Sequence, residues 1–504
     1  MTGNSNHVLR PGETCWCLAH AKRMAVIIDG AAYFRTLKQA ILAARHTVLM
    51  IGWDFHTGIE LERDEITEPD APNTLGAFLS FVVKRNPSLH VHVLRWDLAF
   101  LKMPLRGTTP LVLLNWITSR NIHFRLDANH PSGGCHHQKI VVIDDRLAFC
   151  GGIDSTVGRW DTKDHIDNDP HRDEPDGKRH EPWHDVTTAV DGEAARALGD
   201  LARMRWHAAT GKTLTAAPGE AEIPWPSSLE PRFRDVTVGI ARTWPKTAEM
   251  AETREIEALY LAAIGAARRS IYLESQYFAA PRIGAAIAAR LAEPDGPEII
   301  IVNPKRASGW LEEEAMGSAR ALLLRDLRRL DHGGRLRFAT PVTEGGADIY
   351  VHAKVLVIDD ILLRVGSSNI NNRSMGLDTE CDLAIEVPPD GPDRPEIRAA
   401  ILDVRDALLA EHLGTTIDTL RAAITRTGSL VGAFDALARP SGRSLVPFVP
   451  PPINDLETHI AESGVLDPDC PEAMEPNFVR ALRLIGAPRP RQLITRLTYG
   501  AKSA

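Results

Sequence analysis

The stretch that decides the fold reads HQKIVVIDDRLAFCGGID at residues 137–154, and a close counterpart, HAKVLVIDDILLRVGSSN, stands at residues 352–369. The two segments align without a gap at an offset of 215 residues. Each opens with His-x-Lys, continues as a run of aliphatic residues and closes on a turn of small residues. Self-similarity of this kind predicts that the chain contains two similar halves.

A second repeated block precedes each of these segments. Residues 40–55 read AILAARHTVLMIGWDF and residues 263–278 read AIGAARRSIYLESQYF, at an offset of 223 residues. Each block combines apolar residues at helical spacing with a short apolar run, which predicts a helix followed by a buried strand. Further apolar runs at 90–94 and 298–302 predict one more strand in each half.

The alternation of helices with strands rich in Val, Ile and Leu predicts an α/β fold. We expect two similar α/β domains, each with a mixed, largely buried β-sheet flanked by helices, related by a pseudo-twofold with one active site at their interface. The expected domains span residues 18–215 and 235–425, and a proline-rich connection at 217–231 joins them. Residues 430–504 are expected to form a C-terminal appendage of unknown role.

Composition excludes several classes of protein. The 504 residues are 44% hydrophobic and 25% charged, which is typical of globular chains. A formal charge of −8 disfavours a protein that binds the nucleic-acid backbone. Six cysteines are too few for a disulfide framework. We expect neither a signal peptide nor a membrane span, since no basic leader precedes an apolar core and no apolar run reaches about 18–20 residues.

The repeated motif carries residues suited to phosphate chemistry. His137 and Lys139 are two residues apart, so an extended strand points both to one face, while Asp144 has the opposite parity and suits a role in holding the loop. The second copy repeats these residue types at His352, Lys354 and Asp359. If the halves face each other, the two lysines can neutralise a phosphate while one histidine attacks and the other protonates the leaving group. This chemistry needs no metal, so no metal site is expected.

The turn after each strand adds small residues that allow close backbone approach and offer donors to an anion. The positions are Gly151, Gly152 and Asp154 in the first copy and Gly366, Ser367 and Asn369 in the second.

The pattern His-x-Lys-x4-Asp followed by Gly-Gly or Gly-Ser resembles the phospholipase D superfamily, and both copies are intact. Four further stretches resemble its phosphatidylcholine-type subgroup: GGIDSTVGRWD at 151–161, PWHDV at 182–186, YLESQYF at 272–278 and SSNINNRSMGLDTECDLAIE at 367–386. The resemblance covers about residues 20–425. It implies one active site between two similar domains, a phosphohistidine intermediate, and release of phosphatidic acid and a free head-group alcohol.

The resemblance also implies residue roles. His137 would be the nucleophile and His352 the general acid and then base. The phosphate would be held by Lys139, Lys354, Ser367 and Asn369. Asp185 and Glu380 are candidates for orienting the two histidines, with their pairing left open. A structural role in the motif is expected for Asp144, Asp154, Asp359, Gly151, Gly152 and Gly366.

We therefore expect a phospholipase D that hydrolyses the distal phosphodiester of glycerophospholipids and also transfers the phosphatidyl group to alcohols. One alternative is a cardiolipin synthase-like phosphatidyltransferase, although such enzymes usually carry N-terminal membrane spans. Another is a nuclease of the same superfamily, which the acidic charge disfavours. A lipid-binding protein with an inactive site is disfavoured because both motifs are complete.

The expected partner is a phospholipid substrate at a membrane surface, bound peripherally, with no nucleic acid. No cofactor is expected to be required; activation by a divalent cation and the oligomeric state are left open, and a monomer fits. The expected location is cytoplasmic or peripheral to the membrane, and secretion without a cleaved signal would leave the same sequence. The Asp- and His-rich segment 161–185 favours a solvated insertion near the site over a metal loop, and residues 96–105 with Trp116 favour core over membrane docking.

Overall fold

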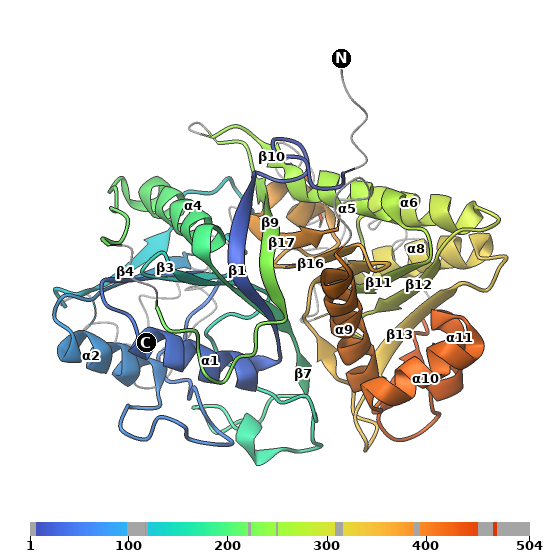
Figure 1. The fold of residues 1–504 in the computed structure, drawn as a ribbon, viewed down its shortest axis with the longest axis horizontal. Helices are drawn as coiled ribbons and strands as arrows, with labels where there is room; N and C mark the ends of the chain where they lie inside the picture. Colours follow the sequence, from blue (N-terminus) through green and yellow to red (C-terminus); the bar gives the residue numbers. More distant parts are fainter. Residues whose placement is uncertain are drawn as a thin grey trace, which may run out of the picture.

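A computed structural model describes residues 7–97, 116, 119–219, 223–247, 250–307, 316–387, 394–451 and 467–470. Its principal feature is one mixed sheet of 16 strands, with helices on both faces (Figure 1). The expected α/β fold, with a buried mixed sheet flanked by helices, is confirmed. The two expected sheets are joined into one, because β1 (Cys17–Ile28) pairs antiparallel with β9 (Phe233–Trp244).

The first part of the chain supplies one half of this sheet. Its other strands are β2 (Thr47–Gly52), β3 (His90–Trp96), β4 (Ile122–Asp127), β5 (Ile140–Ile143), β6 (Leu147–Gly151) and β8 (Val186–Asp191). The short strand β7 (Trp183–His184) belongs to a separate two-stranded sheet. Its helices are α1 (Gly30–Leu42), α2 (Leu75–Arg85) and α4 (Gly192–Thr210), with a 3-10 turn, η2, at Pro170–Arg172.

The second part supplies the other half. Besides β9, its strands are β10 (Thr253–Arg254), β11 (Ser270–Glu274), β12 (Glu298–Val302), β13 (Leu336–Val342), β15 (Val355–Ile358), β16 (Leu362–Gly366), β17 (Glu380–Glu386) and β18 (Ser444–Pro447). The short strand β14 (Tyr350–Val351) pairs with β7 in the two-stranded sheet. Its helices are α5 (Glu255–Ala266), α6 (Pro281–Ala292), α8 (Ser318–Leu330), α9 (Pro395–His412), α10 (Ile417–Thr427) and α11 (Leu430–Leu437), with a π-helical turn, η4, at Arg373–Leu377.

Apart from the edge strand β18, the two halves of the sheet have the same strand order when each is followed from its outer side toward the centre. One half runs β4-β3-β2-β5-β6-β8-β1 and the other β13-β12-β11-β15-β16-β17-β9. In both, the outer three strands pair in parallel and the inner ones antiparallel. This is the arrangement that a sequence repeat predicts; the domain limits at 215 and 235 and the pseudo-twofold stay predictions.

The strands that follow the two motifs lie deep in the molecule. All four residues of β5 and all four of β15 are buried, as expected for central strands that are covered on both faces and read as continuous aliphatic runs. Because the core fixes these two strands, it also fixes the His-x-Lys segments, which directly precede the first residues of β5 and β15.

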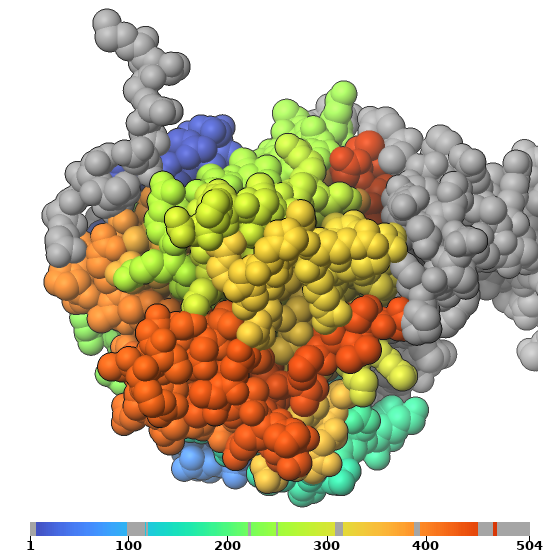
Figure 2. All heavy atoms as spheres, turned by 90° about the vertical axis from the view of Figure 1, so that its right-hand side faces the viewer, coloured from blue at the N-terminus to red at the C-terminus, as the bar shows by residue number. Residues whose placement is uncertain are grey.

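The described part of the expected appendage packs on this body. Helix α11 packs on β12, and Asp435 of α11 pairs with Arg337 of β13; α10 and α11 form the orange-red surface in Figure 2. β18 pairs antiparallel with β13 and so extends the sheet by an edge strand. Residues 452–466 and 471–504 lie outside the described residues, and so does most of the 96–105 run, whereas Trp116 is buried as expected. None of the helices within the described ranges combines the length and apolar character needed to cross a membrane.

Candidate active site

The two His-x-Lys segments are extended chain that precedes the strands, not part of them as the parity argument assumed. β5 and β15 begin directly after the lysine of each motif. The reason is that each segment bonds to chain from the other half: the His137 N–H donates to the Thr379 carbonyl at 2.9 Å, and the His352 N–H donates to the His184 carbonyl at 2.8 Å. The two motifs are thereby held facing each other.

The two motif histidines share one site, with ring centroids 6.5 Å apart. His137 Nδ1 lies 3.0 and 3.1 Å from the Glu380 carboxylate oxygens, and His352 Nδ1 lies 2.7 Å from Asp185 Oδ2. The pairing left open by the sequence is therefore crossed, since each carboxylate supports the histidine of the other half. Neither Nε2 atom has a hydrogen-bond partner among the described residues, so both remain available to a substrate.

Burial controls the charge of these groups. It lowers the pKa of His137 and of His352 well below the ordinary value, and the nearby lysines add to that effect. Both imidazoles are therefore neutral near pH 7, which is the form required of a nucleophile. Burial also raises the pKa of Asp185, while the Lys354 ammonium opposes that rise.

Glu380 is held by two serine hydroxyls. Ser367 Oγ donates to Glu380 Oε2 at 2.5 Å, and Ser374 Oγ donates to Oε1 at 2.7 Å. Burial nevertheless raises the pKa of Glu380 to about 8, although the positive charge of Lys139 acts to lower it. The expected role of Ser367 changes accordingly: its hydroxyl positions a carboxylate, and it is not free to donate to a phosphate.

The two lysines have different surroundings. Lys139 Nζ lies 3.1 Å from Asp154 Oδ2 and donates to the His137 carbonyl at 2.9 Å. Lys354 Nζ donates to the His352 carbonyl and has no carboxylate partner among the described ion pairs. Burial lowers the pKa of Lys354 to about 7, and Lys139 contributes to the shift.

Gln276 is a site residue that the motif analysis missed, although it lies in the quoted YLESQYF stretch. Its Oε1 accepts from Lys354 Nζ at 3.5 Å and from Asn369 Nδ2 at 3.3 Å, while its Nε2 donates to the Tyr350 hydroxyl at 2.9 Å. The Asn369 amide and Lys354 thus share one acceptor, and the buried Asn369 Oδ1 has no partner in the described structure; donation from Asn369 to a phosphate stays a prediction.

The glycines of the two turns were expected to let the backbone approach a substrate closely. In the structure, Gly152 and Gly366 instead make room for carboxylates of the protein itself. A Cβ at Gly152 would overlap the Asp185 carboxylate, and one at Gly366 would overlap the Asp382 carboxylate. Gly151 faces the backbone of Thr187 on the neighbouring strand. Gly152 therefore allows Asp185 to reach its position beneath His352, and Gly366 makes room for Asp382, the partner of Arg364.

The motif aspartates have the loop-holding contacts expected of them. The Asp144 carboxylate accepts the amides of residues 45–47 at 2.6 to 2.8 Å, and Asp359 accepts those of residues 268–270 at 2.6 to 2.8 Å. Each aspartate ties its turn to the end of the helix that precedes β2 or β11.

An aromatic pair that the motif analysis did not single out lies beside the second histidine. Trp183 stacks on Tyr350 with ring centroids 4.7 Å apart, and its ring lies 5.1 Å from the ring of His352. The short parallel pairing of β7 with β14 brings the two aromatic residues together. The stretch PWHDV contains Trp183, but only the fold shows what it contacts.

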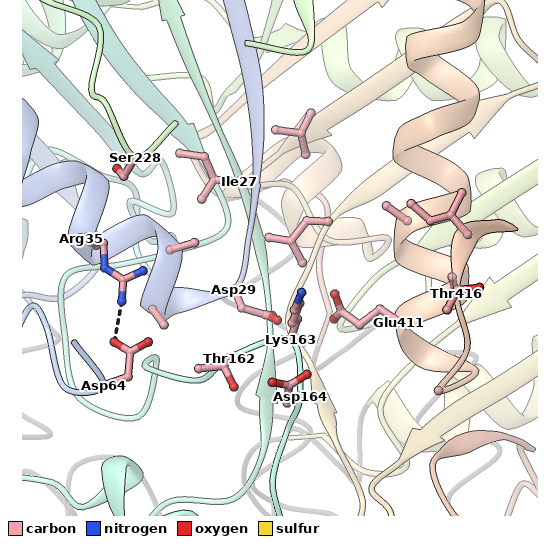
Figure 3. Close-up of a pocket in the computed structure, with 18 of the residues that line it drawn as sticks. Ile27, Asp29, Arg35, Asp64, Thr162, Lys163, Asp164, Ser228, Glu411 and Thr416 are labelled. Carbon is pink, nitrogen blue, oxygen red and sulfur yellow. Dashed lines mark hydrogen bonds and ion pairs between the residues drawn. The ribbon is translucent and has the colours of Figure 1, made fainter. Parts of the chain in front are cut away.

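A cavity of about 890 Å³ lies between the two halves of the chain. Asp29 and Glu411 project toward each other from its opposite walls (Figure 3). His184 Nδ1 lies 3.1 Å from Asp29 and 3.0 Å from Glu411, and His165 Nε2 lies 3.3 Å from Glu411. Burial opposes the charge of His165, but Asp29 and the other carboxylates raise its pKa to about 9.

This cluster corrects the expectation for segment 161–185. His165 is fully buried, so the segment is packed into the body and is not a solvated insertion throughout. Asp29, His165, His184 and Glu411, and also His184, Glu274 and His412, bring their donor atoms within 4.8 Å and could hold a metal ion if the histidines were neutral. As protonated ions, His165 and His184 neutralise the carboxylates instead, whereas burial lowers the pKa of His412.

Two crossed His–carboxylate pairs with two lysines define a site for phosphoryl-group chemistry, and comparisons with known proteins agree with it. Residues 260–391 match a family described as "Cardiolipin synthase, PLD-like domain", and residues 340–460 match "Phospholipase D". The chain belongs to the phospholipase D superfamily.

Individual relatives are distant. Phospholipase D alpha 1 of Carica papaya is 26% identical over 515 residues, and that of Arabidopsis thaliana is 25% identical over 521 residues; each match covers 75% of this chain. The chain spans 63% of the length of these relatives. The solved structure of phosphatidylserine synthase from Haemophilus influenzae Rd KW20 is similar in fold, with a TM-score of 0.50 at 12% identity, over 82% of this chain and 95% of that one.

Proposed function

We propose that the protein is a phospholipase D, which hydrolyses the distal phosphodiester of glycerophospholipids to phosphatidic acid and a head-group alcohol. The observation that carries the proposal is the crossed arrangement of the two histidines, 6.5 Å apart, each backed by a buried carboxylate of the other half. A phosphorus atom between two imidazoles can be attacked from one side while its leaving oxygen is protonated from the other.

In the first step the neutral Nε2 of His137 attacks phosphorus, and Glu380 stabilises the Nδ1–H of the ring as it becomes positive. The bond to the head-group oxygen breaks, and that oxygen takes the proton of the His352 imidazolium. An anionic substrate favours this imidazolium, and Asp185 at 2.7 Å stabilises it further. Lys139 and Lys354 neutralise the charge that develops on the phosphoryl oxygens.

In the second step water attacks the phosphohistidine. His352, now neutral, takes the proton of the water, the P–N bond breaks, and phosphatidic acid leaves with His137 restored. A primary alcohol in place of water gives the transphosphatidylated lipid. No step of this mechanism is assigned to a metal ion, and we place the protein peripherally on a membrane surface.

A phosphatidyltransferase that uses a lipid alcohol as acceptor is the second candidate. It would share the intermediate, and the match of residues 260–391 to the family described by cardiolipin synthase favours it. The nuclease alternative remains disfavoured by the formal charge of −8.

The test is lipid turnover on mixed phospholipid vesicles with a chelator, with and without ethanol. We expect phosphatidic acid in water and phosphatidylethanol with ethanol. His137→Ala and His352→Ala should each abolish turnover, while His332→Ala, at an exposed position away from the site, should not. Cleavage of an oligonucleotide without any lipid turnover would overturn the proposal.

A further inference from the structure

Arg159 lies beside the candidate active site, although neither motif contains it. Its guanidinium carbon lies 4.3 Å from the centroid of the Trp183 ring, and that ring lies 5.1 Å from the ring of His352. The side chain is half-buried. A guanidinium that stacks on an aromatic face keeps its in-plane N–H donors free for another partner.

Arg159 has no anionic partner within the described part of the chain. No carboxylate there forms an ion pair with it; its Nη1 donates to the Gly158 carbonyl at 3.1 Å, and its buried Nε has no hydrogen-bond acceptor. Three carboxylates lie close enough to interact with Arg159 through their charge, and each already has another partner: Asp185 is bonded to His352, Asp54 pairs with Arg95, and Glu174 pairs with Arg63. A partly desolvated charge without a counter-ion is unfavourable, which indicates that an anion completes this site.

Three fully buried arginines of the described structure each have a carboxylate partner, which Arg159 lacks. Arg95 lies 2.9 Å from Asp54, Arg205 lies 2.6 Å from Asp127, and Arg364 contacts Asp382. Carboxylates thus neutralise these three structural arginines, whereas no carboxylate of the described structure forms an ion pair with the arginine beside the two histidines.

The loop around Arg159 is held firmly on both sides. A Cβ at Gly30 would overlap the Arg159 carbonyl, so helix α1 packs directly on this backbone. Gly158 has a φ of 71°, and its amide donates to Glu174 Oε1 at 2.8 Å. On the other side, the Asp161 carbonyl accepts from the Ala31 amide at 2.9 Å. Such anchoring is typical of a side chain whose position matters.

We propose that Arg159 is the third cation of the site and binds a non-bridging oxygen of the substrate phosphodiester, opposite the two lysines. The inference rests on the proposed function and assigns a residue that touches substrate. Lys139 is partly neutralised by Asp154 at 3.1 Å, and burial lowers the pKa of Lys354 to about 7. Arg159 stays charged at every pH of interest, so it holds the anion where Lys354 begins to lose its proton.

The experiment compares the full chain with Arg159→Met, which removes the charge, Arg159→Lys, which keeps it, and Arg329→Met as a control at an exposed arginine of α8. Tungstate, a phosphate-shaped anion, is titrated calorimetrically. Charge-assisted hydrogen bonds of this kind predict about 10- to 100-fold weaker binding for Arg159→Met and a smaller loss for Arg159→Lys. The control should bind as the wild type does, and unchanged thermal unfolding shows that each variant is folded.

Turnover of phosphatidylcholine and phosphatidylserine vesicles is measured with the same variants. We expect kcat/KM to fall by a similar factor for both lipids in Arg159→Met, with a steeper loss above pH 7. Unchanged tungstate binding and turnover would overturn the inference, and so would a loss confined to phosphatidylserine, which would make Arg159 a head-group contact. If the wild type turns over neither lipid, the proposed function fails, whereas the tungstate titration still decides the role of Arg159.

Discussion

Asp185→Asn removes the charge beneath His352 while keeping the shape of the side chain. In the structure Asp185 Oδ2 lies 2.7 Å from His352 Nδ1, and both groups are buried. An asparagine oxygen can still accept the Nδ1–H. The substitution therefore costs the difference in hydrogen-bond free energy between a charged acceptor and a neutral one. Hydrogen bonds to charged groups contribute about 1.5–3 kcal/mol, which corresponds to about 10- to 150-fold in kcat, because the His352 imidazolium matters in the transition state.

The assay is head-group release at saturating phospholipid across pH 5–9. Removing the carboxylate lowers the pKa of His352 further, so the general acid loses its proton at lower pH and the alkaline limb of kcat should move to lower pH. Asp326→Asn is the control, since this exposed residue of α8 pairs with Arg329 of the same helix. A kcat within twofold of the wild type, with an unmoved alkaline limb, would refute the crossed pairing as a catalytic device.

Two further predictions follow from the same region. Gly152→Ala places a Cβ where the Asp185 carboxylate stands, so we expect the free energy of unfolding to fall by about 1–3 kcal/mol and kcat to fall with it, as measured by urea titration and turnover. A value of kcat equal to that of the wild type would contradict the close approach. Burial raises the pKa of Glu380 to about 8 from an ordinary 4.5, so the native state binds the extra proton and stability is lost as pH rises between these values. Glu380→Gln should remove that loss from the unfolding temperature while lowering turnover; an identical pH dependence of unfolding in both proteins would contradict it.

Much of the fold could be predicted because burial is visible in the sequence. The apolar run 298–302 coincides with β12 residue for residue. The repeat predicted two similar halves, and the strands of the two halves follow a matching order. The parity argument for His137 and Lys139 was incomplete, because the backbone of the motif bonds to Thr379, more than 200 residues away in the chain. Local periodicity does not encode such contacts.

The residue types of the site were visible, but their partners were not. Asp185 and Glu380 were correctly placed next to the histidines, yet which carboxylate serves which ring depends on how the halves meet. Ser367 looked like a phosphate donor because it follows a glycine turn, whereas the fold places a buried carboxylate within its reach. Arg159 and Trp183 carried no signal beyond the resemblance of their stretches, since their contact joins separate loops.

The measurement that tests the central claim most directly is capture of the covalent intermediate. A short-chain phospholipid is mixed with the full chain, the reaction is stopped within milliseconds in alkali, where phosphohistidine persists, and the peptides are read by mass spectrometry. The account predicts a phosphatidyl adduct on the peptide that contains His137, absent from His137→Ala. Steady lipid turnover without an adduct, or an adduct carried by His352, would contradict it.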